Sequence, residues 1–299
     1  MRRGACSIIL ALVVVGSILV SCGGQTPSPA IPTATSRATE GLAALVNEQP
    51  IATVDYQKQV AQVEAFFEQE GLDPNSEEGR ERLAQARRQV LEQMIDQELI
   101  RQAATEMGVS ISEAELETNI EDIVEQSGGE EDFNESLQAM GTSYDDFRQM
   151  LLDQLLSEAV FAAVTKSVPP IAEQVHARHI LLPTRERAEE VLARLQGGED
   201  FAFLAGQYSE DISTRERGGD MGFFPRGVMP PEVQNVAFGL DVGQTSGIVE
   251  SQFGFHIVQV LEKEEREIVV EIFENLRQQI FMQWLQEQRE SANIERFIE

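Results

Sequence analysis

The chain has 299 residues, of which 42% are hydrophobic, so it can bury a core and is not a wholly disordered protein. Its formal charge of −28 predicts an acidic surface that repels phosphate backbones, which excludes nucleic acid as an expected partner. Aromatic residues make up only 6%, which favours helical packing over an aromatic-rich β-sandwich.

The N-terminal 22 residues have the pattern of a secretory leader. Arg2 and Arg3 are followed by an apolar run of 13 residues from Ile8 to Val20. Because a membrane-spanning helix needs about 20 residues, this run is too short to span and fits the core of a signal peptide. Loss of the leader removes both arginines and takes the formal charge from −28 to −30.

The leader ends at one of the two cysteines. Residues 19–22 read Leu-Val-Ser-Cys, which resembles a bacterial lipobox and implies cleavage before Cys22 and acylation of that residue. An ordinary signal peptide with an incidental cysteine is the alternative. The other cysteine, Cys6, lies inside the leader, so we expect no disulfide in the mature chain. Residues 23–41 are rich in Gly, Pro, Ser and Thr and predict a flexible tether.

Residues 42–168 show apolar residues at three- and four-residue spacing and predict a helical domain. Ser76, Ser112 and Ser143 have the character of residues that begin helices, and Gly108 ends the longest apolar stripe. Pro169 and Pro170 cannot continue the last helix, so the sequence predicts a domain boundary there.

The segment Val46–Ile51, with the helices after it, resembles the N-terminal domain of SurA- and PrsA-type foldases. The resemblance implies a chaperone module that holds unfolded chains in a groove. No histidine or cysteine lies between residues 42 and 168, so we expect no catalytic site in this part of the chain. A helical spacer with a dimer or docking face is the alternative, and it leaves room for a homodimer.

Residues 171–265 change character and predict a mixed domain in the order β-α-α-β-α-β-β. Strands are predicted near residues 175–182, 245–250 and 255–261, with a further extended run within 218–224. Helices are predicted over residues 186–196, 201–208 and 231–238. The whole chain is therefore expected to belong to the α+β class.

A series of short motifs in this region, in this order, resembles the parvulin family of peptidyl-prolyl isomerases. The motifs are Ala177–Leu182, Tyr208–Asp211, Gly218–Phe224, Gly227–Met229, Ala237–Phe238 and Gly254–Ile257. The resemblance covers nearly all of residues 171–265, and it implies a parvulin-like domain that rotates the peptide bond before proline.

That reaction sets modest chemical demands. Rotation of a peptide bond has to overcome the loss of amide resonance, a barrier of about 18–20 kcal/mol. The enzyme has to bind the twisted bond more tightly than the planar one, which calls for an apolar slot for the proline ring and polar groups around the bond. No nucleophile, metal or cofactor is needed in principle.

The parvulin resemblance also implies the site residues. His179 and His256 match the paired histidines at its centre, Asp211 matches the acidic or cysteine position, and Ser251 falls where a hydroxyl joins the network. The residues that match the proline pocket are Met221, Phe224, Met229, Val233 and Phe238.

Val233 departs from the family pattern, in which phenylalanine is usual. A smaller residue would loosen the pocket, and it keeps open a domain that binds clients without isomerising them. A metal site is not expected. The third histidine, His176, lies three residues before His179, so on a strand the two side chains face opposite sides.

Residues 267–299 again have a helical apolar stripe. By resemblance to the foldase family, this helix is expected to pack back on the first domain, which would then be built from two separate pieces of chain.

These patterns lead to one leading hypothesis. The chain is expected to be a peptidyl-prolyl cis-trans isomerase and folding chaperone, anchored through lipid at Cys22 outside the cytoplasm, on the cell membrane or on an outer membrane where the host has one. Its expected partners are unfolded or partly folded secreted polypeptides with X-Pro bonds. The rival hypotheses are a holdase with an inactive parvulin domain and a structural envelope lipoprotein.

Overall fold

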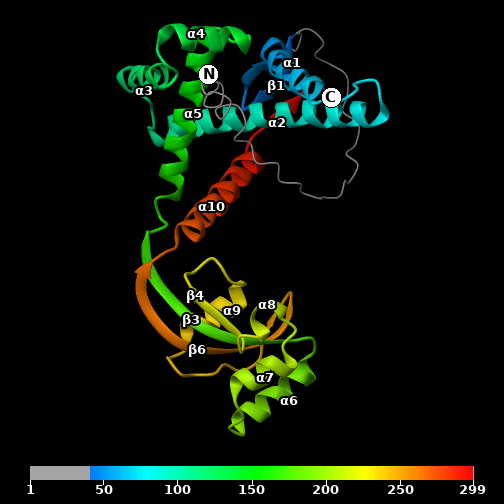
Figure 1. Cartoon of the computed structure of the whole chain (residues 1–299), viewed down its shortest axis with the longest axis vertical. Helices are drawn as coiled ribbons and strands as arrows, with labels where there is room; N and C mark the ends of the chain where they lie inside the picture. Colours follow the sequence, from blue (N-terminus) through cyan, green and yellow to red (C-terminus); the bar gives the residue numbers. More distant parts are fainter. Residues whose placement is uncertain (1–40, 299) are drawn as a thin grey trace, which may run out of the picture. The chain divides into compact units, whose positions relative to one another are not determined.

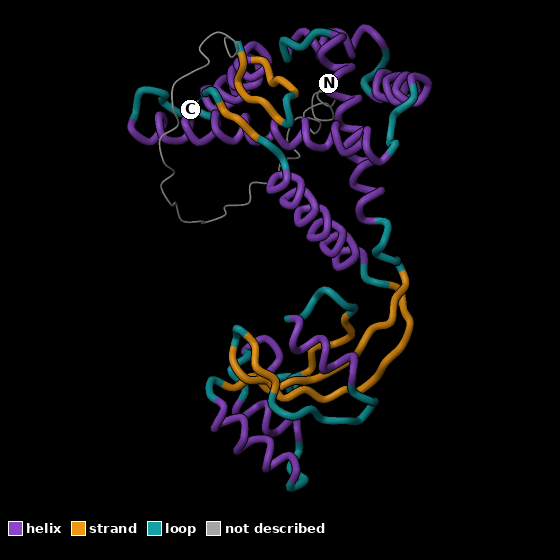
Figure 2. The backbone as a smooth tube through the Cα atoms, turned by 180° about the vertical axis from the view of Figure 1, so that it is seen from behind, coloured by secondary structure: helices purple, strands orange, loops and turns teal. Residues whose placement is uncertain are grey.

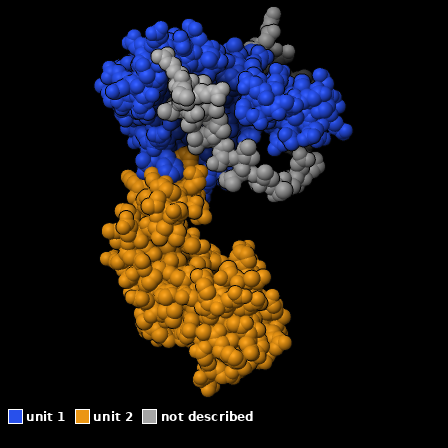
Figure 3. Space-filling model, viewed as in Figure 1, with its two compact units in different colours: residues 1–164, 282–299 blue, residues 165–281 orange. Residues whose placement is uncertain are grey.

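The computed structural model describes residues 41–298, which fall into two compact units (Figure 3). Of the described residues, 41–164 and 282–298 form the first unit, and Thr165–Phe281 form the second. The predicted leader, lipobox and most of the tether lie outside the described residues. Within residues 41–298, no helix is both long enough and apolar enough to cross a membrane.

The first unit contains a small antiparallel sheet that the sequence did not predict. Its strands are β1 (Leu42–Val46), β2 (Gln49–Ala52) and β7 (Ile294–Arg296), in the order β2-β1-β7 (Figure 2). The prediction of helix from residue 42 is therefore wrong for residues 42–52, and helix through to residue 299 is wrong for β7. The turn between β1 and β2 places Asn47 and Glu48 at positive φ, as tight hairpin turns require.

The helices, labelled in Figure 1, begin close to the positions that the sequence predicts. They are α1 (Thr53–Gln69), α2 (Glu77–Met107), α3 (Glu113–Gln126), α4 (Glu130–Ala139) and α5 (Tyr144–Thr165). The side chains of Ser76, Ser112 and Ser143 accept hydrogen bonds from backbone N–H groups three residues on, at 2.9, 3.2 and 3.1 Å. Gly108 ends α2 in the left-handed conformation, which confirms the predicted stop.

Two features hold the first unit together. One is a hydrophobic cluster between α3, α4 and α5, made of Leu116, Ile120, Phe133, Leu137, Phe147 and Leu151. The other joins α2 to the end of the chain, where helix α10 (Val270–Ser291) precedes β7. Arg289 donates hydrogen bonds to Asp96 and, at 2.7 Å, to Glu92. The C-terminal residues therefore complete the first unit through β7 and this ion-pair network.

The second unit is built on a four-stranded antiparallel sheet with the order β4-β3-β6-β5. Its strands are β3 (Ile171–Leu182), β4 (Asp220–Phe224), β5 (Val249–Ser251) and β6 (Gly254–Glu267). β3 and β6 are the two long central strands of the sheet, and they pair along nearly their whole length (Figure 2). The predicted strand near residues 245–250 is shorter than expected, with an isolated bridge at Thr245 before β5 begins.

Helices cover both faces of this sheet, α9 on one and α6 with α7 on the other (Figure 1). They are α6 (Arg185–Gln196), α7 (Phe201–Tyr208), the single turn α8 (Ile212–Arg215) and α9 (Pro231–Gly239). Val258 and Val260 pack in the cluster beside α9, whereas Ile257 packs in the cluster beside α6 and α7. Since side chains alternate along a strand, His256 points to the α9 face with Val258 and Val260.

Candidate functional site

Two buried histidines from neighbouring strands meet at the centre of the second unit. His179 on β3 and His256 on β6 stack with ring centroids 5.5 Å apart and an interplanar angle of 20°. Their Nδ1 atoms lie 3.2 Å apart, which is within hydrogen-bonding distance. The structure therefore brings together the two histidines that the sequence singled out.

Each ring nitrogen that faces away from this contact has a partner of its own. His179 Nε2 lies 2.7 Å from Asp211 Oδ2, and His256 Nε2 lies 2.7 Å from Ser251 Oγ. The four predicted polar residues thus form one continuous chain of hydrogen bonds, in the order Asp211, His179, His256, Ser251.

The direction of these hydrogen bonds follows from the acid at one end. An ionised carboxylate can only accept, so Asp211 accepts from the Nε2–H of His179. With both rings neutral, His179 Nδ1 then accepts from the Nδ1–H of His256, and His256 Nε2 accepts from the Ser251 hydroxyl. The tautomer of each ring is therefore set by its neighbours.

The electrostatic environment places Asp211 and His256 in different charge states. Burial raises the pKa of the Asp211 carboxyl, but hydrogen bonds from Thr214, Ser213 and His179 more than offset it and hold the pKa well below its usual range. Burial, together with the neighbouring His179, lowers the pKa of His256 to about 4. At neutral pH, Asp211 is therefore ionised and His256 is uncharged.

Two residues that the sequence analysis did not identify complete this network. The Thr214 hydroxyl donates to Asp211 Oδ2 at 2.5 Å and lies 3.2 Å from His179 Nε2. The Ser213 hydroxyl and its backbone N–H both donate to Asp211 Oδ1, at 2.7 and 3.0 Å. An available signal was Asp211 itself, because an Asp with Ser and Thr two and three residues later is typical of the start of a helix, here the short α8.

A glycine allows β3 to carry His179 in this position. The backbone N–H of His179 donates to the carbonyl oxygen of Gly219 at 2.9 Å, and Gly219 has a φ of +84°. A Cβ at this position would lie 2.1 Å from the His179 carbonyl oxygen, so only glycine fits without displacement.

All five residues predicted to form the proline pocket lie in or against the hydrophobic cluster on the α9 face of the sheet. Phe224 and Val233 are almost wholly covered, at 1% exposed each, and Phe238 is 8% exposed. Met221 and Met229 are half-buried and pack against that cluster. The cluster shares its face of the sheet with His256, so apolar and polar parts of the candidate site adjoin.

The third histidine takes no part in the network. His176 Nε2 lies 2.8 Å from Asp220 Oδ1, and its ring lies 5.0 Å from that of Phe223. The structure thus gives the second unit two separate His–Asp pairs. Within residues 41–298, no group of three or more His, Cys, Asp or Glu side chains is arranged to hold a metal ion.

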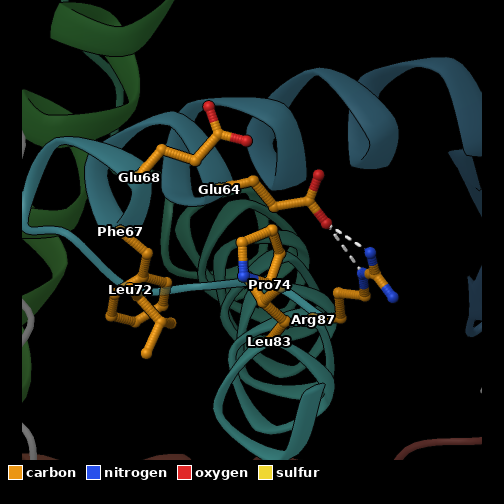
Figure 4. A pocket seen from close by; sticks show the side chains of 7 residues that line it. All are labelled: Glu64, Phe67, Glu68, Leu72, Pro74, Leu83 and Arg87. Carbon is orange, nitrogen blue, oxygen red and sulfur yellow. Dashed lines mark hydrogen bonds and ion pairs between the residues drawn. The ribbon is translucent and has the colours of Figure 1, made fainter. Parts of the chain in front are cut away.

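The first unit has a shallow pocket between the C-terminal half of α1 and the start of α2 (Figure 4). Its volume is about 100 Å³, and Phe67, Leu72, Pro74 and Leu83 form its apolar part. The charged residues that line it are Glu64, Glu68 and Arg87. Glu64 and Arg87 form an ion pair at its edge, as Figure 4 shows.

The geometry agrees with the families that the chain matches. Residues 163–264 match the family model of the PPIC-type PPIASE domain, and residues 1–161 match that of the SurA-like N-terminal domain. The second unit is therefore a parvulin-type peptidyl-prolyl isomerase domain, and the chain combines it with a SurA-like helical domain in an α+β architecture.

Similar proteins narrow the family further. Foldase protein PrsA of Caldanaerobacter subterraneus subsp. tengcongensis is 30% identical over 279 residues, which cover 87% of this chain and 82% of that protein. Foldase protein PrsA of Clostridium tetani is 30% identical over 223 residues, 67% of this chain and 65% of that protein. A crystal structure of the peptidylprolyl isomerase PrsA from Bacillus anthracis is 26% identical, with a TM-score of 0.46 over 67% of this chain and 95% of that one. This chain belongs to the PrsA family of foldases.

Proposed function

We propose that this protein catalyses cis-trans isomerisation of X-Pro bonds in unfolded or partly folded secreted polypeptides, and that it also holds such chains while they fold. The observation that carries the proposal is the hydrogen-bonded chain Asp211–His179–His256–Ser251, which lies on the same sheet face as an apolar cluster. A polar network next to an apolar surface is what rotation of a prolyl bond requires.

In the proposed mechanism the apolar cluster receives the proline ring and the histidine pair faces the rotating bond. As the bond twists, it loses resonance and its nitrogen and carbonyl oxygen change in charge. Preorganised polar groups stabilise such changes at low cost because they do not have to reorient. No bond is made to the enzyme, so the network acts only by binding the twisted form more tightly.

Each polar residue has a distinct part in this mechanism. Asp211 supplies a fixed negative charge that orients His179, and His179 in turn orients His256. Ser251 holds the far nitrogen of His256. The five residues of the proposed proline pocket are Met221, Phe224, Met229, Val233 and Phe238, with Met221 and Met229 the most open to a client.

The first unit is proposed to hold the unfolded chain. Phe66 on α1 is 52% exposed, and its ring lies 6.0 Å from that of Phe67, which lines the pocket of Figure 4. Exposed aromatic side chains beside an apolar hollow are typical of surfaces that bind apolar segments. We expect Phe66→Ser to weaken the suppression of aggregation of an unfolded client without a change in isomerase rate.

The protein is proposed to be anchored outside the cytoplasm through lipid at Cys22. The support is the lipobox-like sequence that ends at this residue and the Gly- and Pro-rich residues after it. Stable anchoring takes two or more acyl chains rather than one. Cys22→Ala should abolish incorporation of labelled palmitate and shift the protein out of the membrane fraction, and retention in that fraction would contradict the proposal.

The isomerase is tested with a soluble form that begins at residue 23 and a short X-Pro peptide. We expect the protein to accelerate cis-to-trans conversion, and His179→Ala and Asp211→Asn each to remove most of that acceleration. Circular dichroism of both variants checks that they remain folded.

The alternative, a holdase with an inactive parvulin domain, makes a different prediction. It is favoured by Val233, which stands where the family usually has phenylalanine. If the folded protein suppresses aggregation of an unfolded client but accelerates no peptide, the holdase replaces the isomerase.

A further inference from the structure

One arginine of the second unit lies against the proposed proline pocket without an acidic partner. The guanidinium of Arg226 lies 4.1 Å from the ring centroid of Phe238, a contact typical of a cation–π interaction. In this otherwise acidic unit, five arginines pair with glutamates. The pairs are Arg185–Glu250, Arg187–Glu190, Arg194–Glu199, Arg266–Glu264 and Arg277–Glu274. Among residues 41–298, no carboxylate oxygen lies within 4.0 Å of the Arg226 guanidinium.

The loop that carries Arg226 is fixed in place on both sides. Pro225 before it is buried, and the backbone N–H of Gly227 after it donates to the side chain of Gln234 on α9. Phe238 is held as well, since Lys263 Nζ donates to its carbonyl oxygen at 2.8 Å and Phe224 packs edge-on against its ring. The backbone on both sides of Arg226 and the ring beneath its guanidinium are therefore held, which favours a position of the guanidinium at the rim of the cluster.

Helix α9 gives the proposed pocket opposite charges at its two ends. Glu232 lies in the first turn of α9, and its charge acts on His256. Phe238, with Arg226 over it, lies near the other end of the helix. Six residues of helix separate Glu232 from Phe238 by about 9 Å, a distance comparable to two or three residues of an extended client.

We propose that Arg226 is a specificity-determining residue that favours clients with Asp or Glu directly beside the isomerised proline. This inference rests on the proposed isomerase function, because it places the proline ring in the cluster next to Phe238. A client carboxylate next to the proline would then reach the Arg226 guanidinium, which can donate two parallel hydrogen bonds to it. The same carboxylate would be repelled from the end of the site where Glu232 lies.

The test uses the full mature protein and two sets of peptides that differ in one residue. One set places Glu, Gln or Lys directly before the proline, and the other places them directly after it. We expect kcat/KM for Glu to exceed that for Gln about two- to fivefold in one of the two sets, the size typical of an exposed charge pair. The preference should arise through KM and shrink in about 0.5 M salt, because screening weakens exposed pairs.

Variants separate specificity from support of the fold. Arg226→Gln should remove the preference for Glu, because it lowers kcat/KM for the Glu peptide more than for the Gln peptide, and Arg226→Lys should keep part of the preference. Arg187→Gln is the matched control, since it removes one positive charge from an exposed helix of the same unit. Equal slowing of Glu and Gln peptides by Arg226→Gln would overturn the proposal, as would a wild-type protein with no preference in either set.

A failure of the isomerase itself gives a different result. If the wild type accelerates no peptide, the proposed function fails, and the preference is read instead from the Kd of the same peptides by NMR titration. Tighter binding of the Glu peptide that is lost in Arg226→Gln would still support the role of Arg226. Equal Kd values would overturn it.

Discussion

The two units of this protein differ in where they keep their charges. Residues 41–164 and 282–299 contain 31 acidic and 9 basic residues, a formal charge of −22, and no histidine. Residues 165–281 contain 19 acidic and 11 basic residues, a formal charge of −8, and all three histidines. The unit with fewer charges is the one that buries a polar network. The candidate site is therefore distinguished by where its polar and charged groups lie, not by how many charged residues its unit contains.

Two aspartates illustrate the same point at the level of single residues. Lys58 and Ser143 lower the pKa of the Asp146 carboxyl at the exposed start of α5. Asp211 is itself the N-cap of the short helix α8, whereas Asp146 lies in the first turn of α5, which Ser143 caps. Both carboxylates accept from a hydroxyl group, but only that of Asp211 also contacts a buried histidine, and this contact joins it to the network.

A large loss of stability in the first unit should leave the candidate site of the second unit intact. Phe133 is 2% exposed and packs edge-on against Phe147, with ring centroids 5.0 Å apart. Phe133→Ala should destabilise the first unit by about 3–5 kcal/mol. Urea unfolding followed by the fluorescence of Trp284, the only tryptophan, reports on this unit.

Because the candidate site lies in the second unit, we expect the isomerase rate of Phe133→Ala to stay near that of the wild type under conditions where the variant is folded. Phe66→Ala is the matched control, because half of that side chain is already exposed and its removal should hardly change stability. Loss of isomerase rate in proportion to loss of stability in the first unit would contradict the independence of the two units.

Two glycines of the second unit differ in how closely their surroundings approach. Gly219→Ala has to displace the carbonyl of His179, so it should cost at least about 3 kcal/mol and abolish isomerisation. Gly198→Ala has a similar positive φ, of +90°, but open space around the new Cβ, and should cost only about 1–2 kcal/mol. Denaturant midpoints of the two variants, followed by the NMR signals of the histidines, measure the difference. Equal costs would show that backbone conformation alone, rather than contact with His179, demands glycine.

Acidification should affect the second unit first. The pKa of His256 is lowered to about 4 in the folded protein, so the unfolded chain binds a proton more readily than the folded one. Stability is therefore fully present above the ordinary histidine pKa of 6.5 and is lost as pH falls toward 4. Urea midpoints of the second unit should drop between pH 7 and pH 5, and His256→Gln should flatten this dependence.

The stability of the first unit should hardly change between pH 7 and pH 5. It has no histidine, and the lowered pKa values of Glu92 and Asp146 lie below those of ordinary carboxyls, so their stabilisation is lost only in more acidic solution. A midpoint from Trp284 that falls as steeply as the histidine signals between pH 7 and pH 5 would contradict this assignment.

Salt should change the stability of the two units by different, small amounts. A formal charge of −22 implies self-repulsion within the first unit, and salt screens it over a distance that falls from about 10 Å at 0.1 M to about 3 Å at 1 M. Added sodium chloride should therefore stabilise the first unit more than the second, by about 1 kcal/mol or less. The two midpoints, from Trp284 and from the histidines, are compared across a salt series.

Local signals were enough to predict the helices and the parvulin layout. Ser76, Ser112 and Ser143 begin helices because a serine hydroxyl near its own backbone can cap the first turn, which needs no distant contact. The histidines and Asp211 were identified through motifs that lie in order along the chain. Their hydrogen-bonded arrangement agrees with what those motifs implied.

The parts that could not be predicted depend on contacts between distant residues. The sequence pattern assigned β1 and β2 to a helical domain. Local patterns could not show otherwise, because β1 also pairs with β7, which lies at the far end of the chain. Thr214 showed no signal of its own, since its role comes from the fold of α8 against His179. Arg226 was not singled out from the sequence, because its contact with the Phe238 ring depends on the fold.

The two His–Asp pairs of the second unit allow a direct test of whether the hydrogen-bonded network carries the isomerase activity. Asp211→Asn removes the charge next to His179, whereas Asp220→Asn removes the equivalent charge next to His176, outside the network. Loss of a hydrogen bond to a charged group should cost Asp211→Asn at least about tenfold in the rate of X-Pro isomerisation, while Asp220→Asn stays within about threefold of the wild type. Equal rates for wild type and Asp211→Asn, with both proteins folded, would contradict the claim that this chain of hydrogen bonds carries the activity.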